Sequence, residues 1–235
     1  MALPYFYQAD ITLTTEQVTL DESTSKHVAQ VLRMQVGEQL QLTDGRGNLF
    51  TTAIIDDNRK KCLLKILSIS SQPAPNKKIT IAISLVKNVT RFEWFLEKAT
   101  EIGVNEIVPL ICTRTEKQHF RQDRMQGILV SAMLQSQQSW LPVLQEPTKL
   151  LSILLQPPTT QKLIAHCEAT SKQQLIGLLK NDAMDQIILI GPEGDFSPEE
   201  ITQALQHHFI PVALGNTRLR TETAGVVAAT LLCNG

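Results

Sequence analysis

The N-terminal part of the chain shows short apolar or alternating runs separated by polar turns. Segments 44–48 and 56–60, which interrupt these runs, are rich in Asp, Gly and Asn. Runs of this kind are typical of β-strands joined by tight turns. Between Glu22 and Met34 apolar residues recur at helical spacing instead, and Gly37 follows as a stop. The pattern predicts a small β-barrel with one helix, and its strands are expected at Gln39–Thr43, Leu49–Ile55 and Cys62–Ile69.

From residue 79 onward, apolar strand-like runs alternate with segments of helical periodicity. This alternation favours an α/β fold with a mostly parallel sheet covered by helices. Between the two patterns, the stretch 70–76 holds small and polar residues with Pro73 and Pro75, which interrupt regular hydrogen bonding. We therefore predict a β-barrel domain over residues 1–72 and an α/β domain over residues 73–235. The expected strands of the second domain are Ile79–Val86, Ile107–Ile111, Leu163–His166, Ile187–Ile190 and Val212–Leu214.

Three helices of the second domain are located by their ends. Thr90 and Glu93 form a T-x-x-E capping box before an apolar stripe, which predicts a helix over Arg91–Ile102. The sequence Ser-Pro-Glu-Glu from residue 197 predicts the start of a second helix, because it combines a capping Ser with a first-turn Pro and a Glu at the third position. A last helix over Glu222–Leu232 holds mostly small and aliphatic residues, so we expect it to be buried on most sides.

Composition narrows the class of protein but names no partner. With 235 residues, 43% of them hydrophobic, and a net charge of −1, the chain can build a sizeable core and is no polyelectrolyte. No apolar run reaches the roughly 18 residues that span a bilayer, and the N-terminus lacks the regions of a leader peptide. The four cysteines are single and far apart. We expect a soluble, cytoplasmic protein with no membrane segment, no metal and no disulfide framework.

Glycine-containing loops follow two of the predicted strands. Gly191 and Gly194 follow Ile187–Ile190, and Gly215 follows Val212–Leu214. In open α/β sheets, ligands bind beyond the carboxyl ends of the strands. Glycines there let the backbone approach a ligand and offer it N–H and C=O groups, as a flat heteroaromatic base requires. Each loop alone can be an ordinary turn, and it is the occurrence of two in one sheet that favours a binding site.

The signatures of other nucleotide-binding folds do not occur. The chain contains no G-x-x-x-x-G-K-[ST] phosphate loop, and its G-x-G at Gly45–Gly47 falls in a predicted hairpin. An NTPase is therefore disfavoured, as is a hydrolase with a nucleophile elbow.

Motifs spread over nearly the whole chain occur together in one family. They are Leu189–Gly194, Leu214–Gly215 with Leu219–Ala224, and Val31–Met34, accompanied by His27, Gly37, Asp44–Gly45, Lys87, Arg91, Lys98–Gly103, Pro109–Leu110 and Gln135–Ser136. In these residues the chain resembles the ribosomal RNA small subunit methyltransferase E family, within the SPOUT, or trefoil-knot, methyltransferases. The resemblance implies an α/β domain with a knotted, mostly parallel sheet, preceded by a PUA-like RNA-binding β-barrel.

The same resemblance implies a reaction and its participants. The reaction is methylation of the N3 position of a uridine near the 3′ end of 16S rRNA in the small ribosomal subunit, with S-adenosyl-L-methionine as donor and a homodimer as working unit. Backbone groups of the two loops and hydroxyls of two threonines are expected to bind the cofactor, although Thr221 could equally cap the last helix. The residues concerned are Leu189, Ile190, Gly191, Pro192, Gly194, Leu214, Gly215, Leu219, Thr221 and Thr223.

Catalysis at uridine N3 is expected to involve charged residues beside these loops. Methyl transfer from a sulfonium needs mainly positioning, removal of the weakly acidic N3 proton, and stabilisation of negative charge on O2 and O4. We hypothesise that Arg220 stabilises this charge and that Glu222 or Glu193 either accepts the proton or fixes the Arg. The structural alternatives are a surface salt bridge between Arg220 and Glu222 and a helix-terminus charge role for Glu193.

Basic residues of both domains are candidates for contacts with RNA phosphates, which fix position rather than read sequence. Each of them could equally be a solvated surface charge. His27 and His166 are expected to be structural, and Trp94 to be a core residue or a dimer contact. The RNA candidates are Arg33, Arg46, Lys60, Lys61, Lys87, Arg91, Arg114 and Lys117, together with Gln135.

Three positions depart from the family pattern. Asp195 stands where a second Gly is usual, and Leu134 and Gln138 stand where Glu and Arg are usual. The first adds a carboxylate beside the cofactor loop, and the other two remove an acid and a base near the dimer or RNA face. Two alternative functions therefore stay open. One is a non-catalytic RNA-binding or assembly factor of the same fold, and the other is a SPOUT methyltransferase that acts on a ribose 2′-OH or on tRNA.

Overall fold

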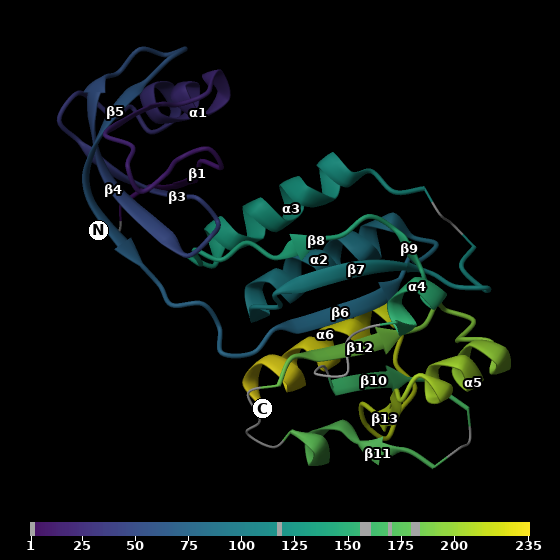
Figure 1. The fold of residues 1–235 in the computed structure, drawn as a ribbon. Coiled ribbons are helices and arrows are strands. Elements are labelled where there is room, and N and C mark those ends of the chain that lie inside the picture. The colour runs from purple at the N-terminus through teal and green to yellow at the C-terminus, as the bar shows by residue number, and fades with distance from the viewer. Residues whose placement is uncertain (1–2, 117–118, 156–160, 169–170, 180–183) are drawn as a thin grey trace. The chain divides into compact units, whose positions relative to one another are not determined.

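The chain folds into two compact units, each of which is described separately (Figure 1). The structure is a computed structural model that describes residues 3–116, 119–155, 161–168, 171–179 and 184–235. The first unit comprises residues 1–74 and 133–141, and the second comprises residues 75–132 and 142–235. Among the described residues, no helix has the length and apolar character needed to cross a membrane.

The first unit is built on a five-stranded sheet around its own hydrophobic core. Residues of β3 and β4 alternate between the core and the surface, so that Leu40, Leu42, Phe50 and Ile54 are all fully buried. The small β-rich domain predicted from the turns is thus confirmed. In sheet order its strands are β1 (Tyr5–Tyr7), β3 (Gln39–Thr43), β4 (Asn48–Asp56), β5 (Leu63–Ser71) and β2 (Gln17–Thr19); β1 runs parallel to β3, and the other pairs are antiparallel.

The helix of the first unit is shorter than the pattern predicts. An α-helical turn, α1 (Glu22–Lys26), is capped by the side chain of Asp21 and continues as a π-helical turn, η1 (His27–Val31). Arg33 then adopts a left-handed backbone conformation with φ of 57°, which ends the helix before Met34. The predicted helix over 22–34 therefore stops about one turn early.

A segment distant in sequence completes the first unit. The indole ring of Trp140 lies against Gly47, where an added Cβ would come within 2.4 Å of the ring, and the Leu141 N–H donates to the carbonyl of Gly45 at 2.9 Å. The Tyr5 hydroxyl donates to the carbonyl of Gln138 at 2.9 Å. Segment 133–141 therefore belongs to the first unit, whereas the sequence pattern assigned it to the second domain.

The second unit is built on an eight-stranded sheet whose strand pairs are all parallel. Its central strands are buried on both faces, which explains why they appear in the sequence as continuous apolar runs. The predicted parallel α/β architecture is confirmed. In sheet order the strands are β11 (Gln173–Gln174), β13 (Ile210–Ala213), β10 (Gln161–Ala165), β12 (Gln186–Ile190), β6 (Ile79–Ser84), β7 (Glu106–Ile111) and β8 (Val143–Leu144), and β9 (Thr148–Lys149) also pairs with β7.

Helix α2 (Val89–Ile102) begins differently from the prediction. Its N-cap is Asn88, whose side chain accepts a hydrogen bond from the Thr90 N–H at 3.0 Å. The predicted capping box of Thr90 and Glu93 is wrong, because the Glu93 carboxylate pairs instead with Arg124 of α3 (Gln122–Gln135). The predicted end is confirmed, since Gly103 closes the helix in a left-handed conformation.

Helices cover both faces of the second sheet. One face packs against α4 (Leu150–Leu154) and α5 (Pro198–Gln206), and α5 starts with the predicted capping box of Ser197 and Glu200. The other face packs against α2 and the final helix, α6 (Thr221–Asn234), which lies on β6 and β12. A short 3₁₀ turn, η2 (Leu175–Leu178), follows β11. The sequence pattern did not indicate α3 or α4.

The tightest contact of α6 predicts a large effect of one methyl group. At Gly225 an added Cβ would approach Cε2 of Phe95 to 2.6 Å and Cδ1 of Ile83 to 2.7 Å. Gly225→Ala therefore overpacks a filled core and should lower the free energy of unfolding by about 1–3 kcal/mol. Thermal unfolding followed by circular dichroism measures this loss.

The matched control for this prediction is Gly127→Ala in α3, where a Cβ meets nothing within 4 Å. This substitution removes the flexibility of a helical glycine and should stabilise the protein by about 0.5–1 kcal/mol. Equal unfolding midpoints for the two variants would contradict the packing argument.

Candidate functional site

A cleft opens where the carboxyl ends of three neighbouring strands meet. The loops that follow β10, β12 and β13 line two hollows of about 420 Å³ and 370 Å³. The hollows share lining residues from the β10 end, from the β13–α6 loop and from α6, so they form one continuous cleft in the second unit. The shared residues are Ala165, Cys167, Arg218, Leu219 and Ala224. Its position is the one expected for a ligand site in an open parallel sheet.

Most of the residues predicted to bind a cofactor line this cleft. The first hollow is lined by Ile190, Gly191, Pro192, Leu219 and Thr221, and the second by Leu214, Gly215 and Leu219. Three predicted residues do not line it. Leu189 is fully buried in the core, Gly194 lies beside the side chain of Arg114, and Thr223 lies on α6 beyond the lining.

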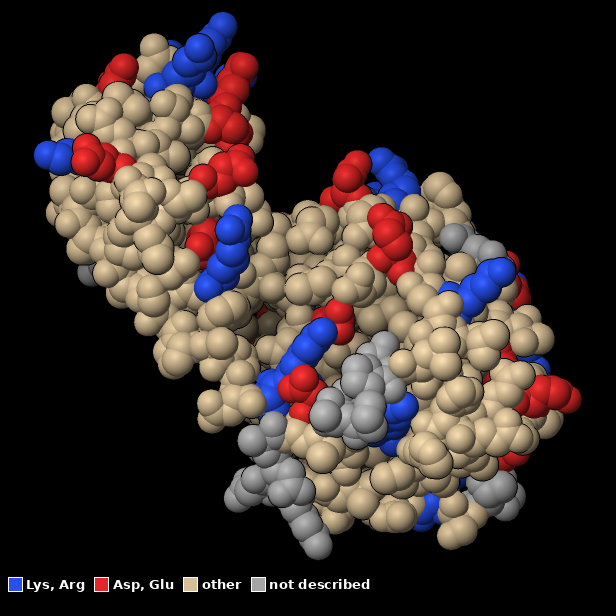
Figure 2. All heavy atoms as spheres, viewed as in Figure 1, with Lys and Arg blue, Asp and Glu red and all other residues tan. Residues whose placement is uncertain are grey.

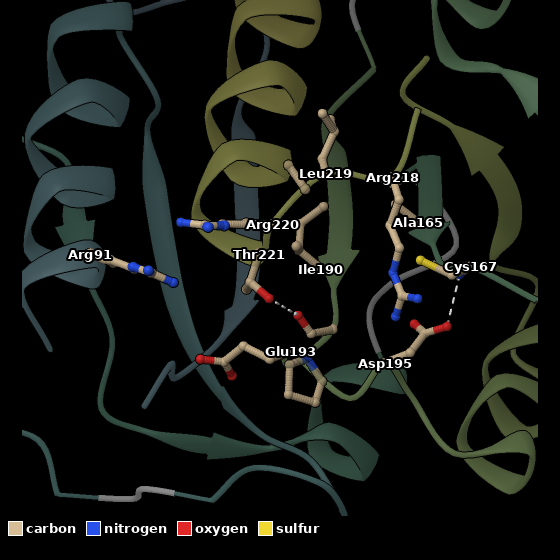
Figure 3. A pocket seen from close by; sticks show the side chains of 13 residues that line it. Arg91, Ala165, Cys167, Ile190, Glu193, Asp195, Arg218, Leu219, Arg220 and Thr221 are labelled. Carbon is tan, nitrogen blue, oxygen red and sulfur yellow. Dashed lines mark hydrogen bonds between the residues drawn. The ribbon is translucent and has the colours of Figure 1, made fainter. Parts of the chain in front are cut away.

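The first loop needs glycine at position 191. A Cβ there would come within 3.0 Å of the Phe196 ring and 3.2 Å of the Phe196 nitrogen. The carbonyl of Gly191 accepts a hydrogen bond from the buried Thr221 hydroxyl at 3.0 Å (Figure 3). Thr221 therefore joins the β12 loop to the start of α6, and the N-cap position of α6 is taken by Arg220.

Asp195, in the loop that follows β12, connects this loop to the end of β10. It adopts a left-handed conformation with φ of 63°, which Asp tolerates better than most residues and glycine tolerates best. Its carboxylate accepts a hydrogen bond from the Cys167 N–H at 2.8 Å, and the side chain of Arg218 points toward it (Figure 3). The departure from the family's glycine thus falls where the backbone favours glycine, and the added carboxylate connects two loops of the cleft.

Glu222 is paired with a residue other than the one predicted. Its side chain is 8% exposed, and Oε1 lies 3.7 Å from Nε of Arg91 on α2. Its Oε2 is buried and has no hydrogen-bond partner within the described ranges. The alternative of a surface salt bridge between Arg220 and Glu222 is wrong, since the ion pair of Glu222 is with Arg91. Arg91, predicted to contact RNA phosphates, lines the cleft and pairs there with Glu222.

Arg220 and Glu193 stand at the same side of the cleft as Arg91. Figure 3 shows the side chains of Arg220 and Arg91 extending from α6 and α2 toward one space, with the Glu193 carboxylate below them. Glu193 Oε1 accepts a hydrogen bond from the Lys87 N–H at 2.9 Å, so it connects the β12 loop to the chain that precedes α2. An adjoining hollow of about 610 Å³ is lined by Lys87, Asn88, Val89, Arg91 and Glu193.

The end of β10 is the part of the cleft that the sequence analysis missed. Ala165, His166 and Cys167 line the cleft, and His166 was expected to be structural. The sequence does contain a signal for it. Leu163–His166 is predicted as a strand of the same parallel sheet, so its carboxyl end must lie at the same edge as those of the two strands with glycine loops. Its loop was overlooked because it contains no glycine.

The remaining RNA candidates are scattered. In the first unit, Lys60 and Lys61 lie in the turn after β4, while Arg46 lies in the turn before it and donates to the Ala9 carbonyl at 2.8 Å. The nine residues of β4 separate these two turns by roughly 30 Å. Arg33 is exposed and comes shortly before Gly37. The Gly37 N–H donates to the carbonyl of Ile54, near the end of β4 that Lys60 follows. The structure therefore does not gather these residues into one basic patch.

The described candidates of the second unit have local partners. Lys87 pairs with Glu116 at 2.9 Å, and Arg114 donates to the carbonyl of Gly194 at 2.7 Å, so that Arg114 supports the cofactor loop. Lys117 lies outside the described residues. Gln135 lies in the part of α3 that belongs to the first unit, and it is exposed. On the face seen in Figure 2, Lys and Arg form small separate groups, most with Asp or Glu beside them.

The cysteines are chemically distinct from one another. Cys167 is exposed at the cleft, while burial raises the pKa of the Cys112 thiol to about 12 and those of Cys62 and Cys233 to about 11. All four are free thiols. Within the described ranges, His, Cys, Asp and Glu side chains nowhere form a group of three that could hold a metal ion.

Comparison with known proteins connects this architecture to a family. A family model described as an RNA methyltransferase domain matches residues 72–233, and one described as an RNA methyltransferase PUA domain matches residues 20–67. Ribosomal RNA small subunit methyltransferase E of Synechocystis is 30% identical over 94% of this chain and 72% of its own length.

Solved structures agree with these matches. The crystal structure of a probable rRNA-methyltransferase from Porphyromonas gingivalis is 40% identical with a TM-score of 0.89, and the match covers 97% of this chain and 95% of that one. Ribosomal RNA small subunit methyltransferase E of Neisseria gonorrhoeae, bound to S-adenosyl methionine, is 28% identical with a TM-score of 0.85 over 97% of this chain and 95% of that one. By its catalytic-domain match, its PUA-domain match and its full-length relatives, this chain belongs to the ribosomal RNA small subunit methyltransferase E family of RNA methyltransferases.

Proposed function

We propose that the protein transfers a methyl group from S-adenosyl-L-methionine to N3 of a uridine in the 16S rRNA of the small ribosomal subunit. The observation that carries the proposal is the cleft, where the ends of β10, β12 and β13 meet beside Arg91, Arg220 and Glu193. Family membership supports the class of reaction, and the Neisseria gonorrhoeae relative is a structure with this cofactor bound.

The residues of the cleft fit the cofactor. Phe196 leaves no room for a side chain at position 191. Because this residue is glycine, the backbone of the loop itself faces the cleft. Apolar surface from Ile190, Leu219 and Ala224 suits a flat adenine ring. The two hollows, at about 420 Å³ and 370 Å³, are of the size of small-molecule sites. Backbone groups of Gly191, Leu214 and Gly215 would supply most of the polar contacts.

The protein's own residues would then perform the proton and charge chemistry. When bound, S-adenosyl-L-methionine supplies a methyl group activated by its sulfonium, so the leaving group is neutral. Arg220 is exposed at the cleft and stabilises the negative charge that spreads onto O2 and O4 of the uracil. Glu193 accepts the N3 proton, because its carboxylate faces the same space, whereas Glu222 is buried and holds Arg91.

The first unit would bind the RNA, and two copies of the chain would form the working enzyme. The PUA-domain match supports the first of these proposals. The exposure of Trp94 on α2 supports the dimer. Its side chain is 42% exposed, so Trp94 is no core residue and suits a subunit contact. Light scattering after size exclusion tests the dimer, because a mass of 26.2 kDa would identify a monomer.

We also propose that the second unit is knotted. β13 lies on the far side of β10 from β12, yet α6 packs on β12, β6 and α2. The chain must therefore cross back over the carboxyl ends of β10 and β12 between residues 213 and 221. An experimental density map that is continuous over residues 161–235 tests the proposal. The chain traced through it should remain knotted when its two ends are pulled apart.

The reaction is tested by identifying the methylated nucleoside. Labelled S-adenosyl-L-methionine is incubated with the protein and with unmodified small subunits, naked 16S rRNA or bulk tRNA. We expect label as 3-methyluridine in the small subunits, because an arginine exposed at the cleft can stabilise the negative charge that develops on O2 and O4 of a uracil. A ribose-methylated product, or label in tRNA alone, would overturn the substrate. Absence of label in every pool, with RNA binding retained, would identify a non-catalytic RNA-binding factor.

Arg220→Ala should separate catalysis from cofactor binding. Loss of one group that stabilises developing charge typically lowers turnover by about 100-fold to 1,000-fold. The affinity for S-adenosylhomocysteine should change by less than about threefold, since the cofactor contacts come from other residues. Single-turnover kinetics and calorimetry measure the two quantities.

The matched control is Arg121→Ala, which removes an exposed arginine of the same unit away from the cleft. If Arg220→Ala and Arg121→Ala methylate RNA at the wild-type rate, Arg220 has no part in catalysis. A parallel loss of cofactor affinity in Arg220→Ala would instead assign it to binding.

Cys167 offers a test of cofactor binding that is independent of activity. It is exposed at both hollows, while the raised pKa values of the other three thiols keep them protonated at pH 8. Iodoacetamide should therefore modify Cys167 first, as peptide mass mapping can measure. S-adenosylhomocysteine should slow this modification at least about fivefold, and adenosine triphosphate should not. Equal rates with and without S-adenosylhomocysteine would place the cofactor elsewhere.

A further inference from the structure

His166 has an unusual environment for a buried histidine. It follows β10 directly, is 7% exposed and lines the second hollow of the cleft. Both ring nitrogens, Nδ1 and Nε2, are buried, and neither has a hydrogen-bond partner in the part of the chain that the structure describes. A buried polar group without a partner costs roughly 1–3 kcal/mol relative to one that is satisfied. Such a group in the wall of a cavity indicates that something else pairs with it.

The surroundings of His166 keep its ring neutral. Burial lowers the pKa of His166 below its ordinary value of 6.5, and nearby Lys172 lowers it further, against the opposing influence of Asp195 and Glu168. Arg218 lines the same hollow and adds a second positive charge. A neutral imidazole offers one N–H donor and one acceptor nitrogen. It therefore suits a partner that can both accept and donate a hydrogen bond.

The other groups around the hollow restrict what this partner can be. Besides His166, Cys167 and Lys172, the lining is formed by the loop from Val212 to Leu219 and by the small residues Ala165 and Ala224. A backbone loop with polar groups, facing small apolar residues, fits a nucleoside. Among the groups of a nucleoside, a ribose hydroxyl is both donor and acceptor, so it can pair with either tautomer of the ring.

We infer that His166 binds the methyl donor, through a hydrogen bond between its imidazole and a ribose hydroxyl of the adenosyl group. This inference rests on the proposed function, because it takes the cleft to hold S-adenosyl-L-methionine. It assigns a side-chain contact to a site whose other expected contacts come mainly from the backbone. His166 is thus a ligand-binding residue.

The inference is tested by a cycle that combines a variant with altered ligands. Calorimetry gives the dissociation constant of S-adenosylhomocysteine and of its 2′-deoxy and 3′-deoxy forms, for the wild type and for His166→Leu. Wild type should bind one of the deoxy forms about tenfold more weakly than the parent ligand, as expected for one buried hydrogen bond. His166→Leu should bind that form and the parent ligand equally, because the two changes remove the same interaction.

A second variant separates binding from a merely structural role. His166→Gln keeps a polar group but cannot titrate, whereas protonation of wild-type His166 removes its acceptor nitrogen and adds charge beside Lys172 and Arg218. Wild-type affinity should therefore fall by up to about tenfold, the effect expected for this one hydrogen bond, as the pH is lowered through the depressed pKa of His166. His166→Gln should show no such fall. His207→Gln, which changes a histidine of the same unit outside the cleft lining, should retain the wild-type pH dependence.

The outcomes distinguish this inference from the proposed function. One outcome is that the wild type binds S-adenosylhomocysteine, but each deoxy form loses as much affinity in His166→Leu as in the wild type. The inference is then overturned and the function stands. The same holds if His166→Gln retains the acid loss of affinity. If the wild type does not bind S-adenosylhomocysteine at any pH, the cofactor assignment fails, and the inference fails with it.

Discussion

The close contact between α6 and the strand and helix beneath it determines the geometry of the whole cleft. Gly225 lets the backbone of α6 lie directly on Phe95 and Ile83, where no larger side chain fits. Arg220, Thr221, Glu222 and Ala224 precede this contact within two turns, so its position fixes theirs. The same contact brings α2 alongside α6, and it thereby places Arg91 opposite Glu222. A helix rich in small residues is therefore a requirement of the site as well as of the core.

Three loops with little regular structure are held in place by hydrogen bonds between them. Thr221 bonds to the carbonyl of Gly191, Asp195 accepts from the Cys167 N–H, and Glu193 accepts from the Lys87 N–H. Each bond joins segments that are far apart in sequence and adjacent at the edge of the sheet. Because every one of them uses a backbone group on one side, the loops keep their conformation without depending on a second side chain. A preorganised cleft of this kind loses less entropy on binding a ligand.

The parts predicted from the sequence are those set by local pattern, and the parts missed depend on distant contacts. The buried strands and the capped start at Ser197 follow from apolar runs and capping residues. The capping box at Thr90 failed because Asn88 was available two residues earlier and Glu93 had a better partner in α3.

The same distinction applies to the site. The two glycine loops could be located from sequence because glycine has a local conformational meaning. The pairing of Arg91 with Glu222 and the contribution of the β10 end could not, since each depends on how separate elements meet. The place of segment 133–141 in the first unit could not be predicted either, because hydrophobic patterns reflect only residues that are close along the chain.

The charges of the cleft explain how a protein of net charge −1 can act on a polyanion. Two of its acidic groups are held within the protein, Glu222 by Arg91 and Asp195 by the Cys167 N–H. The side chain of Arg220, in contrast, makes no hydrogen bond or ion pair with any described residue, so its charge is available to a ligand. Screening in salt weakens long-range attraction beyond roughly 8–10 Å, and the net charge of the chain offers little of it. Binding of a polyanion must then depend on short-range contacts, such as those that Arg220 offers at the cleft.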